Sequence, residues 1–284
     1  MKINRIQETI GLGGRLSILI LFLSLSLSAQ EKLIILHTSD MHSRVEPVER
    51  KDDRDFDKGG LVRRATFLKE FRKDNPDVLL FDSGDFSQGT PYYNMFQGEV
   101  EVELMNEMKY DAMTIGNHEF DFGLENMARL FKMAKFPVVC ANYDVDATVL
   151  KGLVEPYTII KRDGVRIGVL GLGYPLEGMV QANKCEGVVF KNPIETANEV
   201  AAILKNKEKC DVVICLSHLG VQYDKKELIP NIRNIDIVLG GHSHTFMKTP
   251  MMLSDKDGKS VTLMHSGARG VNVGRMDLTL SKKK

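Results

Sequence analysis

The sequence lacks tryptophan, carries no net charge and contains only four cysteines. Its 38 basic side chains are balanced by 38 acidic ones, so no overall basic surface favours a nucleic-acid polymer as partner. No two cysteines have the CxxC spacing, which argues against a thiolate metal site. Cys140 and Cys215 lie in or at the end of apolar runs, as buried free thiols do, and we expect no structural disulfide.

Hydrophobic runs of transmembrane length are also missing after residue 30. The beginning of the chain differs, because three basic residues precede the apolar stretch from Leu16 to Leu27 and the small pair Ser28-Ala29 follows it. This order is typical of a secretory signal peptide. We therefore expect residues 1–29 to be removed and the remainder to be exported, either periplasmic or secreted, with no stable membrane insertion. An uncleaved membrane anchor is the alternative.

Short apolar runs alternate with helical patterns over residues 30–284, which predicts one α/β domain with a layered core. The runs that predict buried strands are Leu33–Leu36, Val78–Phe81, Ala112–Ile115, Val138–Cys140, Ile167–Leu170, Val212–Leu216 and Ile235–Leu239. Apolar residues at helical spacing predict helices over Leu61–Phe71, Val100–Met108, Leu124–Ala134 and Pro193–Leu204. Asp257-Gly258 predicts a hairpin turn between Met251–Leu253 and Val261–Met264. The charged segment 46–58 is interpreted as a solvated loop over the active face.

Polar residues follow five of the predicted strands at the point where each strand ends. They are Asp40 and His42, then Asp85, then Asn117 and His118, then His218, and finally His242 and His244. The carboxyl ends of adjacent strands in an α/β sheet face one crevice, so we expect these groups to converge. Buried carboxylates lose several kcal/mol of hydration unless they are compensated, and divalent cations are the obvious compensation here.

The spacing of these residues predicts the direction in which two pairs of side chains point. Residues i and i+2 of an extended segment point the same way, so Asp40 with His42, and His242 with His244, are each expected to aim two ligands into one pocket. The full set is too large for one ion. Two ions bridged by a carboxylate would use all of it.

Five ordered motifs resemble the metal-binding blocks of the calcineurin-like metallophosphoesterases. They are Asp40-x-His42, Gly84-Asp85, Gly116-Asn117-His118-Glu119, Ser217-His218 and Gly240-Gly241-His242-Ser243-His244. The longer stretches 37–42, 82–90 and 116–121 resemble, more narrowly, the N-terminal catalytic domain of the exported 5'-nucleotidase/UDP-sugar hydrolase family. That resemblance implies a four-layer α/β/β/α sandwich of two mixed sheets, which the run of strands and helices does not by itself distinguish from a doubly wound sheet.

The resemblance also implies a role for each residue. Asp40, His42, Asp85 and His244 would hold one divalent ion, and Asp85 would bridge to a second ion held also by Asn117, His218 and His242. His118 would contact the phosphoryl group or the leaving oxygen, and Asp121 would orient its ring. The nitrogen and oxygen ligands suit Mn, Zn, Fe or Co. Many nucleotidases of this type have glutamine where His244 stands, and this departure is expected to alter the metal preference.

The implied reaction is hydrolysis of a small phosphate ester, most simply a 5'-nucleotide, by in-line attack of water activated by the two ions. The resembling nucleotidases carry a second, C-terminal domain that holds the nucleoside, and its residues have no counterpart in this sequence. The chain would then be the catalytic half of a split 5'-nucleotidase whose partner is a separate chain. Alternatively, it is a self-sufficient phosphoesterase acting on cyclic nucleotides, UDP-sugars or small monoesters. A third interpretation, from another class, is a non-catalytic metal-holding docking module.

Overall fold

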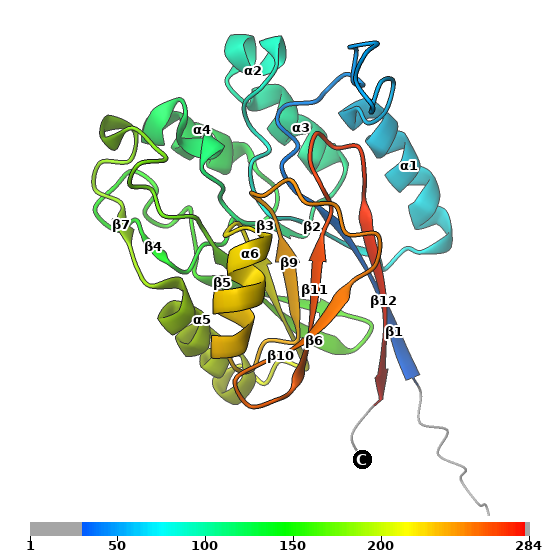
Figure 1. The fold of residues 1–284 in the computed structure, drawn as a ribbon, viewed down its shortest axis with the longest axis vertical. Helices are drawn as coiled ribbons and strands as arrows, with labels where there is room; N and C mark the ends of the chain where they lie inside the picture. The colour runs from blue at the N-terminus through cyan, green and yellow to red at the C-terminus, as the bar shows by residue number, and fades with distance from the viewer. Residues whose placement is uncertain (1–29, 282–284) are drawn as a thin grey trace, which may run out of the picture.

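The structure is a computed structural model that describes residues 30–281 (Figure 1). The predicted signal peptide, residues 1–29, lies outside the described residues. Within the described part of the chain, no helix has the length and hydrophobicity that a membrane crossing requires.

Two mixed β-sheets form the centre of the molecule. The first has the order β12-β1-β2-β3, in which β12 is antiparallel to β1 and the other pairs are parallel. The second has the order β10-β11-β9-β8-β6-β5, with an antiparallel pair at each edge and parallel pairs between. The strands of the first sheet are β1 (Gln30–Thr38), β2 (Leu79–Asp82), β3 (Ala112–Met113) and β12 (Gly274–Ser281). Those of the second are β5 (Tyr157–Arg162), β6 (Val165–Leu172), β8 (Val212–Ser217), β9 (Ile237–Gly240), β10 (Met251–Ser254) and β11 (Ser260–His265).

Alternate side chains of each strand enter different core layers. In β8, Val212, Ile214 and Leu216 face the first sheet, whereas Val213 and Cys215 pack with the helices on the outer face. The strands of the first sheet alternate in the same way, so one apolar cluster lies between the sheets and one lies outside each of them. Successive side chains of a strand point to opposite faces of its sheet, and both faces are covered here. The strands therefore read as continuous apolar runs in the sequence.

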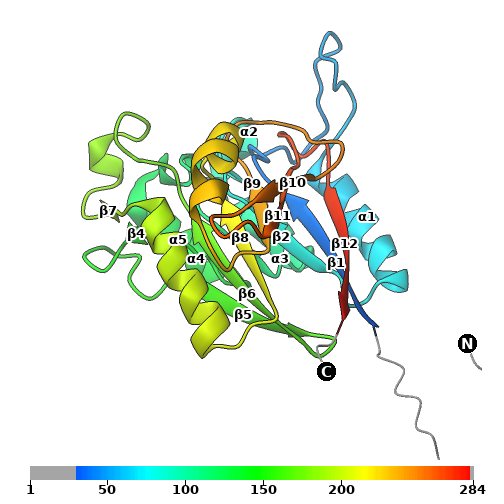
Figure 2. The same ribbon diagram turned by 60° about the horizontal axis from the view of Figure 1, so that its bottom comes forward.

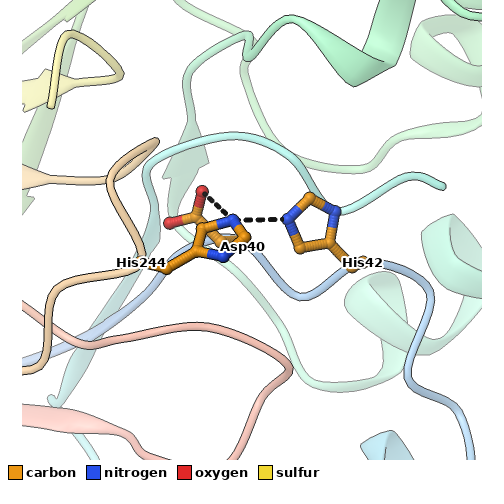
Figure 3. A group of neighbouring side chains, drawn as sticks. All are labelled: Asp40, His42 and His244. Carbon is orange, nitrogen blue, oxygen red and sulfur yellow. Dashed lines mark hydrogen bonds and ion pairs between the residues drawn. The ribbon is translucent and has the colours of Figure 1, made fainter. Parts of the chain in front are cut away.

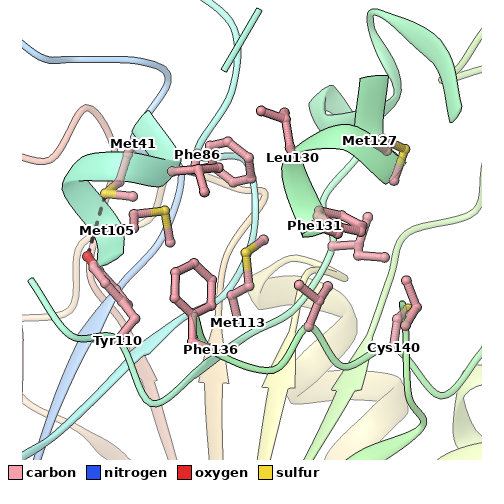
Figure 4. Close-up of a cluster of buried hydrophobic side chains, with 14 of the residues drawn as sticks. Met41, Phe86, Met105, Tyr110, Met113, Met127, Leu130, Phe131, Phe136 and Cys140 are labelled. Carbon is pink, nitrogen blue, oxygen red and sulfur yellow. Dashed lines mark hydrogen bonds between the residues drawn. The ribbon is translucent and has the colours of Figure 1, made fainter. Parts of the chain in front are cut away.

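Helices cover the outer face of each sheet (Figures 1 and 2). On the first sheet they are α1 (Leu61–Asp74), α3 (Glu99–Glu107) and α4 (Gly123–Met133), and on the second α5 (Pro193–Ala202) and the helical segment that begins with α6 (Val221–Tyr223) and continues through η4 (Asp224–Leu228). Methionine and aromatic side chains fill the space between α3, α4 and the first sheet, with Phe86, Met105 and Met113 fully buried (Figure 4). The predicted four-layer α/β/β/α sandwich of two mixed sheets is therefore confirmed.

Most of the predicted elements are present, and the differences have physical reasons. The hairpin of β10 and β11 is antiparallel, as Asp257-Gly258 predicted. Val138–Cys140 was predicted as a strand, but Val138 and Val139 form only single bridges, to Met113 and Glu155, at the edge of the first sheet. The edge strand β12 was missed because the exposed Arg275 and Asp277 interrupt its apolar residues, and β5 because its few apolar residues are only half-buried and are followed by two charges. Helix α2 (Pro91–Phe96), which buries Tyr93, was also missed.

Candidate metal centre

The loops that follow β1, β2, β3, β8 and β9 meet at one rim of the two sheets. They bring together all seven residues predicted as metal ligands. A hollow of about 380 Å³ opens above them, lined by His42, Asp85, Asn117, His242 and His244 together with His118. Asp40 and His218 lie beneath it and are fully buried. The predicted convergence at the strand ends is thus confirmed.

Three groups of side chains have ligand atoms within 4.8 Å of one another. The first is Asp40, His42 and His244, in which the two imidazole Nε2 atoms are 2.9 Å apart (Figure 3). The second is Asp85, His218 and His242. The third is His42, Asp85 and His118. Asp85 therefore lies between a group on the His42 side and a group on the His218 side.

The reason predicted for this grouping was wrong. Asp40 and His42 do not alternate along an extended segment, because both have a left-handed backbone, with φ of 49° and 47°. His242 and His244 are also left-handed, with φ of 69° and 51°, and they belong to different groups rather than to one pocket. Residues other than glycine in this region cost on the order of 1–3 kcal/mol each and are concentrated at functional sites. Tight turns, not strand alternation, aim these ligands.

Two glycines allow the loops after β2 and β3 to approach each other. A Cβ on Gly116 would lie 2.1 Å from Asp85 Oδ1, and a Cβ on Gly84 would lie 2.6 Å from the backbone nitrogen of Gly116. Gly84 also has a φ of +88°. The glycine of GNHE is thus required so that the carboxylate of Asp85 can sit against the neighbouring loop.

His218 is held in one orientation by its two ring nitrogens. Nδ1 donates to the carbonyl oxygen of Ser83 at 2.6 Å, which leaves Nε2 to face Asp85 Oδ2 at 3.1 Å. Burial alone lowers the pKa of His218, but the nearby Asp85 carboxylate outweighs that effect and raises it to about 10. A proton on Nε2 thus balances the carboxylate, at the place where a cation would do the same.

The chemistry of the remaining donors fits a divalent metal. Asp40 Oδ2 is buried without a hydrogen-bond partner, and burial raises the pKa of Asp40. Burial lowers the pKa of both His42 and His242 to about 4, so their imidazoles are neutral and able to bind metal at neutral pH. Asn117 Oδ1 lies 3.0 Å from His242 Nδ1. Among residues 30–281, no lysine or arginine forms an ion pair with Asp40 or Asp85.

His118 and Asp121 form a pair at the edge of the hollow. His118 Nδ1 is 3.0 Å from Asp121 Oδ2, and this hydrogen bond raises the pKa of His118. The backbone N–H of His118 donates to Asp85 Oδ1 at 2.9 Å. His118 also belongs to the third group, with His42 and Asp85.

Sequence reasoning missed the role of Glu119. Its buried carboxylate accepts hydrogen bonds from the backbone N–H groups of Asp85 (3.0 Å), Ser87 (3.2 Å) and Gly116 (2.7 Å). Burial, followed by the charge of Asp85, raises the pKa of Glu119 to about 7. Its position two residues after Asn117 was the available signal, since carboxylates that orient metal-binding loops are commonly close to the ligands.

Two arginines and a tyrosine also border the site. Arg44 and Arg269 line the hollow. Arg269 is bonded through its backbone N–H to the carbonyl of Asp40 and through its guanidinium to Asp53 and Asp55. It thereby ties the charged 46–58 segment to the site. Tyr174 stacks on His242, with ring centroids 4.0 Å apart.

Comparison with known proteins identifies the family of this chain. The calcineurin-like phosphoesterase family profile matches residues 33–246. A snake venom 5'-nucleotidase from Crotalus adamanteus is 33% identical over 276 residues, covering 89% of this chain and 46% of the relative.

Solved structures agree with these sequence comparisons. A 5'-nucleotidase precursor from Thermus thermophilus is 32% identical with a TM-score of 0.83, over 88% of this chain and 52% of the other. The calcineurin-like phosphoesterase YfkN from Bacillus subtilis is 28% identical with a TM-score of 0.75, over 90% of this chain and 87% of the other. The chain spans about half the length of the curated relatives it matches. With the fold, the ordered motifs and the ligand cluster in agreement, the chain belongs to the calcineurin-like phosphoesterase family.

Proposed function

We propose that this protein hydrolyses phosphate monoesters, most simply 5'-nucleotides, with a pair of divalent metal ions. The observation that carries the proposal is the position of Asp85. Its carboxylate lies within 4.8 Å of a ring nitrogen of His42 on one side and of ring nitrogens of His218 and His242 on the other. One carboxylate between two groups of nitrogen donors is the arrangement that a two-metal site requires. The similarity to 5'-nucleotidases supports the choice of substrate.

Each of the seven ligands has a proposed place. Asp40, His42 and His244 would hold one ion and Asn117, His218 and His242 the other, with Asp85 between them. Divalent ions bound there would lower the pKa of bound water and neutralise the phosphoryl oxygens. The ligand set contains nitrogen and oxygen but no sulfur, which suits Mn, Zn, Fe or Co.

The other side chains would act on the substrate or on the ligands. His118, whose pKa is raised by its hydrogen bond to Asp121, would donate a hydrogen bond to the phosphoryl group or to the leaving oxygen. His218 would be kept in the correct tautomer by the Ser83 carbonyl. Glu119 would hold the Asp85 and Gly116 loops at their close approach.

The proposal is tested by assaying AMP and 4-nitrophenyl phosphate with Mn²⁺, for the wild type and for His118→Ala. We expect hydrolysis by the wild type, a loss of roughly 10²-fold or more in kcat for His118→Ala, and two metal ions per chain in both proteins. A wild type that binds metal without hydrolysing any ester would instead support a metal-holding module, whereas full hydrolytic activity in His118→Ala would refute the role proposed for His118. Loss of one ion in His118→Ala would make His118 a ligand.

We further propose that residues 1–29 direct export and that the enzyme acts in the periplasm or outside the cell. N-terminal sequencing of the protein from the culture medium or periplasm tests this, with a new terminus after Ser28 or Ala29 as the expected result.

A separate chain that supplies nucleoside specificity is tested in the assay of AMP hydrolysis. If such a partner is needed, AMP hydrolysis by this chain alone is weak and rises sharply on its addition, whereas a self-sufficient enzyme shows no change.

A further inference from the structure

We propose that Asp224 is a positioning residue that fixes the distance between His218 and His242, two of the proposed metal ligands. The inference rests on the proposed two-metal function and concerns a buried acid that is not itself a proposed ligand. Asp224 belongs to the helical segment that begins with α6 and lies over the second sheet (Figure 1), and its side chain is inaccessible to solvent. Its carboxyl group lies at the ends of β8, β9 and β11.

The side chain of Asp224 joins strands that are not direct neighbours. Ser217 of β8, Gly240 of β9 and His265 of β11 are paired in register, so they form one row across the second sheet. The hydroxyl of Ser217 donates to one carboxyl oxygen of Asp224 at 2.6 Å, and His265 Nε2 lies 2.9 Å from the other oxygen. The two outer strands of the row are therefore connected through Asp224, and β9 lies between them.

The middle strand has a glycine at the point where this connection crosses it. A Cβ on Gly240 would lie 2.7 Å from Oδ2 of Asp224 and closer still to Nε2 of His265, nearer than a real Cβ approaches another atom. Glycine at this position thus lets the hydrogen bond between Asp224 and His265 lie against the backbone of β9. His242 follows Gly240 by two residues. The contact therefore holds β9 directly before the loop that carries this ligand.

The turn that carries His218 is attached to Asp224 on both sides. Ser217, directly before His218, makes the hydroxyl bond, and its oxygen also accepts from the backbone N–H of Leu219 at 3.3 Å. The backbone N–H of Asp224 donates to the carbonyl oxygen of Gly220 at 2.9 Å. One buried residue thus restrains the backbone before and after this ligand.

These contacts act mainly on one of the two proposed ions. His218 and His242 lie in the same group of candidate ligands, whereas His244 is the one residue of the loop after β9 in the other group. Metal–ligand distances tolerate deviations of only about 0.2 Å, so two imidazoles must keep their spacing to bind one ion. Loss of the Asp224 contacts should therefore weaken one ion more than the other.

The test measures Mn²⁺ binding by calorimetry, in protein freed of metal by a chelator. Asp224→Ala and His265→Leu remove the connection from its two sides. In each we expect one ion to bind about 10–100-fold more weakly than in wild type and the other to stay within about twofold. His265 Nδ1 is buried without a hydrogen-bond partner, so the ring donates from Nε2. His265→Gln supplies an amide donor instead and should bind both ions nearly as wild type does.

Leu204→Ala is the control for a general loss of stability. Leu204 is fully buried in the same core layer but packs beside Gly168 of β6, away from the row of Ser217 and His265. This variant should lower the urea midpoint of unfolding and leave the affinities for both ions unchanged.

Wild-type affinities for both ions in Asp224→Ala and His265→Leu would overturn the inference and leave the proposed function standing. Equal weakening of both ions, or the same weakening in Leu204→Ala, would show a general loss of stability and also overturn it. If Asp224→Ala does not fold, equal affinities in His265→Leu and His265→Gln overturn it instead. A wild type that binds fewer than two ions, or hydrolyses no ester, overturns the proposed function, and this inference with it.

Discussion

The buried carboxylate of Glu119 accepts a hydrogen bond from the backbone N–H of Asp85 at 3.0 Å. The same oxygen accepts from Gly116 at 2.7 Å, so one side chain joins the loops that follow β2 and β3. These two loops carry Asp85 and Asn117. The position of two proposed ligands relative to each other therefore depends on a third residue that is not itself a proposed ligand.

Replacing this residue should weaken metal binding. In Glu119→Gln, an amide NH₂ would face one of the backbone N–H groups, because the carboxylate now uses both oxygens to accept. We expect the affinity for Mn²⁺ to fall by roughly 10–100-fold, while kcat at saturating Mn²⁺ falls less. Mn²⁺ titration by calorimetry measures this. The same substitution at the exposed Glu103 of α3 is the control, and equal affinities in the two variants would refute the role.

The carboxylate of Asp85 should be indispensable. Asp85→Asn keeps the shape and tolerates the left-handed backbone but removes the charge between the two groups. We expect fewer than two bound ions per chain and a fall of roughly 10³-fold in kcat/KM. Asp163→Asn is a matched control, because Asp163 lies outside the site and is also left-handed, with φ of 49°. Full metal content in Asp85→Asn would contradict the bridging role.

Chelation should abolish activity reversibly. Prolonged treatment with EDTA is expected to remove hydrolysis of all esters, and added Mn²⁺ or Zn²⁺ should restore it, since the proposed chemistry depends on the ions. Assay after dialysis with each metal in turn would rank the metals. Activity that survives complete removal of metal, verified by elemental analysis, would be incompatible with the proposal.

A buried pair behind the site should contribute to stability. His265 Nε2 lies 2.9 Å from Asp224 Oδ2, with both side chains inaccessible to solvent, and Ser217 donates to the other carboxylate oxygen at 2.6 Å. His265→Leu would leave the carboxyl without its ring partner, and we expect a loss of about 3–5 kcal/mol in the free energy of unfolding. Urea unfolding in the presence of a chelator measures it. Arg275→Ala, which breaks an exposed pair with Asp277, should cost less than about 1 kcal/mol.

Stability should also depend on pH through Asp82. Burial raises the pKa of this carboxyl to about 8, although it accepts hydrogen bonds from Thr38 and from the backbone of Gly84. The unfolded state ionises near pH 4 and the folded state near pH 8, so the stabilisation from the neutral form is complete below pH 4 and is lost as the pH rises to 8. Asp82→Asn removes this dependence. The stability of the variant relative to wild type should therefore increase by up to about 3 kcal/mol between pH 5 and pH 8.

Urea unfolding at both pH values, with chelator present, measures that difference. The exposed Asp74→Asn serves as control and should show no such trend. A constant difference between Asp82→Asn and wild type across this range would mean that Asp82 is ionised in the folded protein.

The buried strands were predictable because both of their faces are covered. β1, β2, β6 and β8 read as continuous apolar runs, and each was predicted within a few residues. Edge strands have one partner and one solvated side, so β12 has charges between its apolar residues and β5 has only a short, half-buried apolar stretch; both strands were missed for that reason. Helix α2 was missed because the burial of Tyr93 is a tertiary contact, which local composition does not reveal.

By itself, the order of polar residues after the apolar runs determined that carboxylates, imidazoles and an amide would converge at one rim, since parallel strands end together. The resemblance of the motifs implied which ion each residue would hold, and only the tertiary structure decided the backbone geometry that separates the two groups. His242 and His244 lie two positions apart, yet left-handed turns send them to different groups. Likewise, Glu119 orients Asp85 across 34 positions of sequence. Backbone turns and contacts between distant loops depend on the packed sheets that bring those loops together, and for that reason no pattern in the sequence specified them.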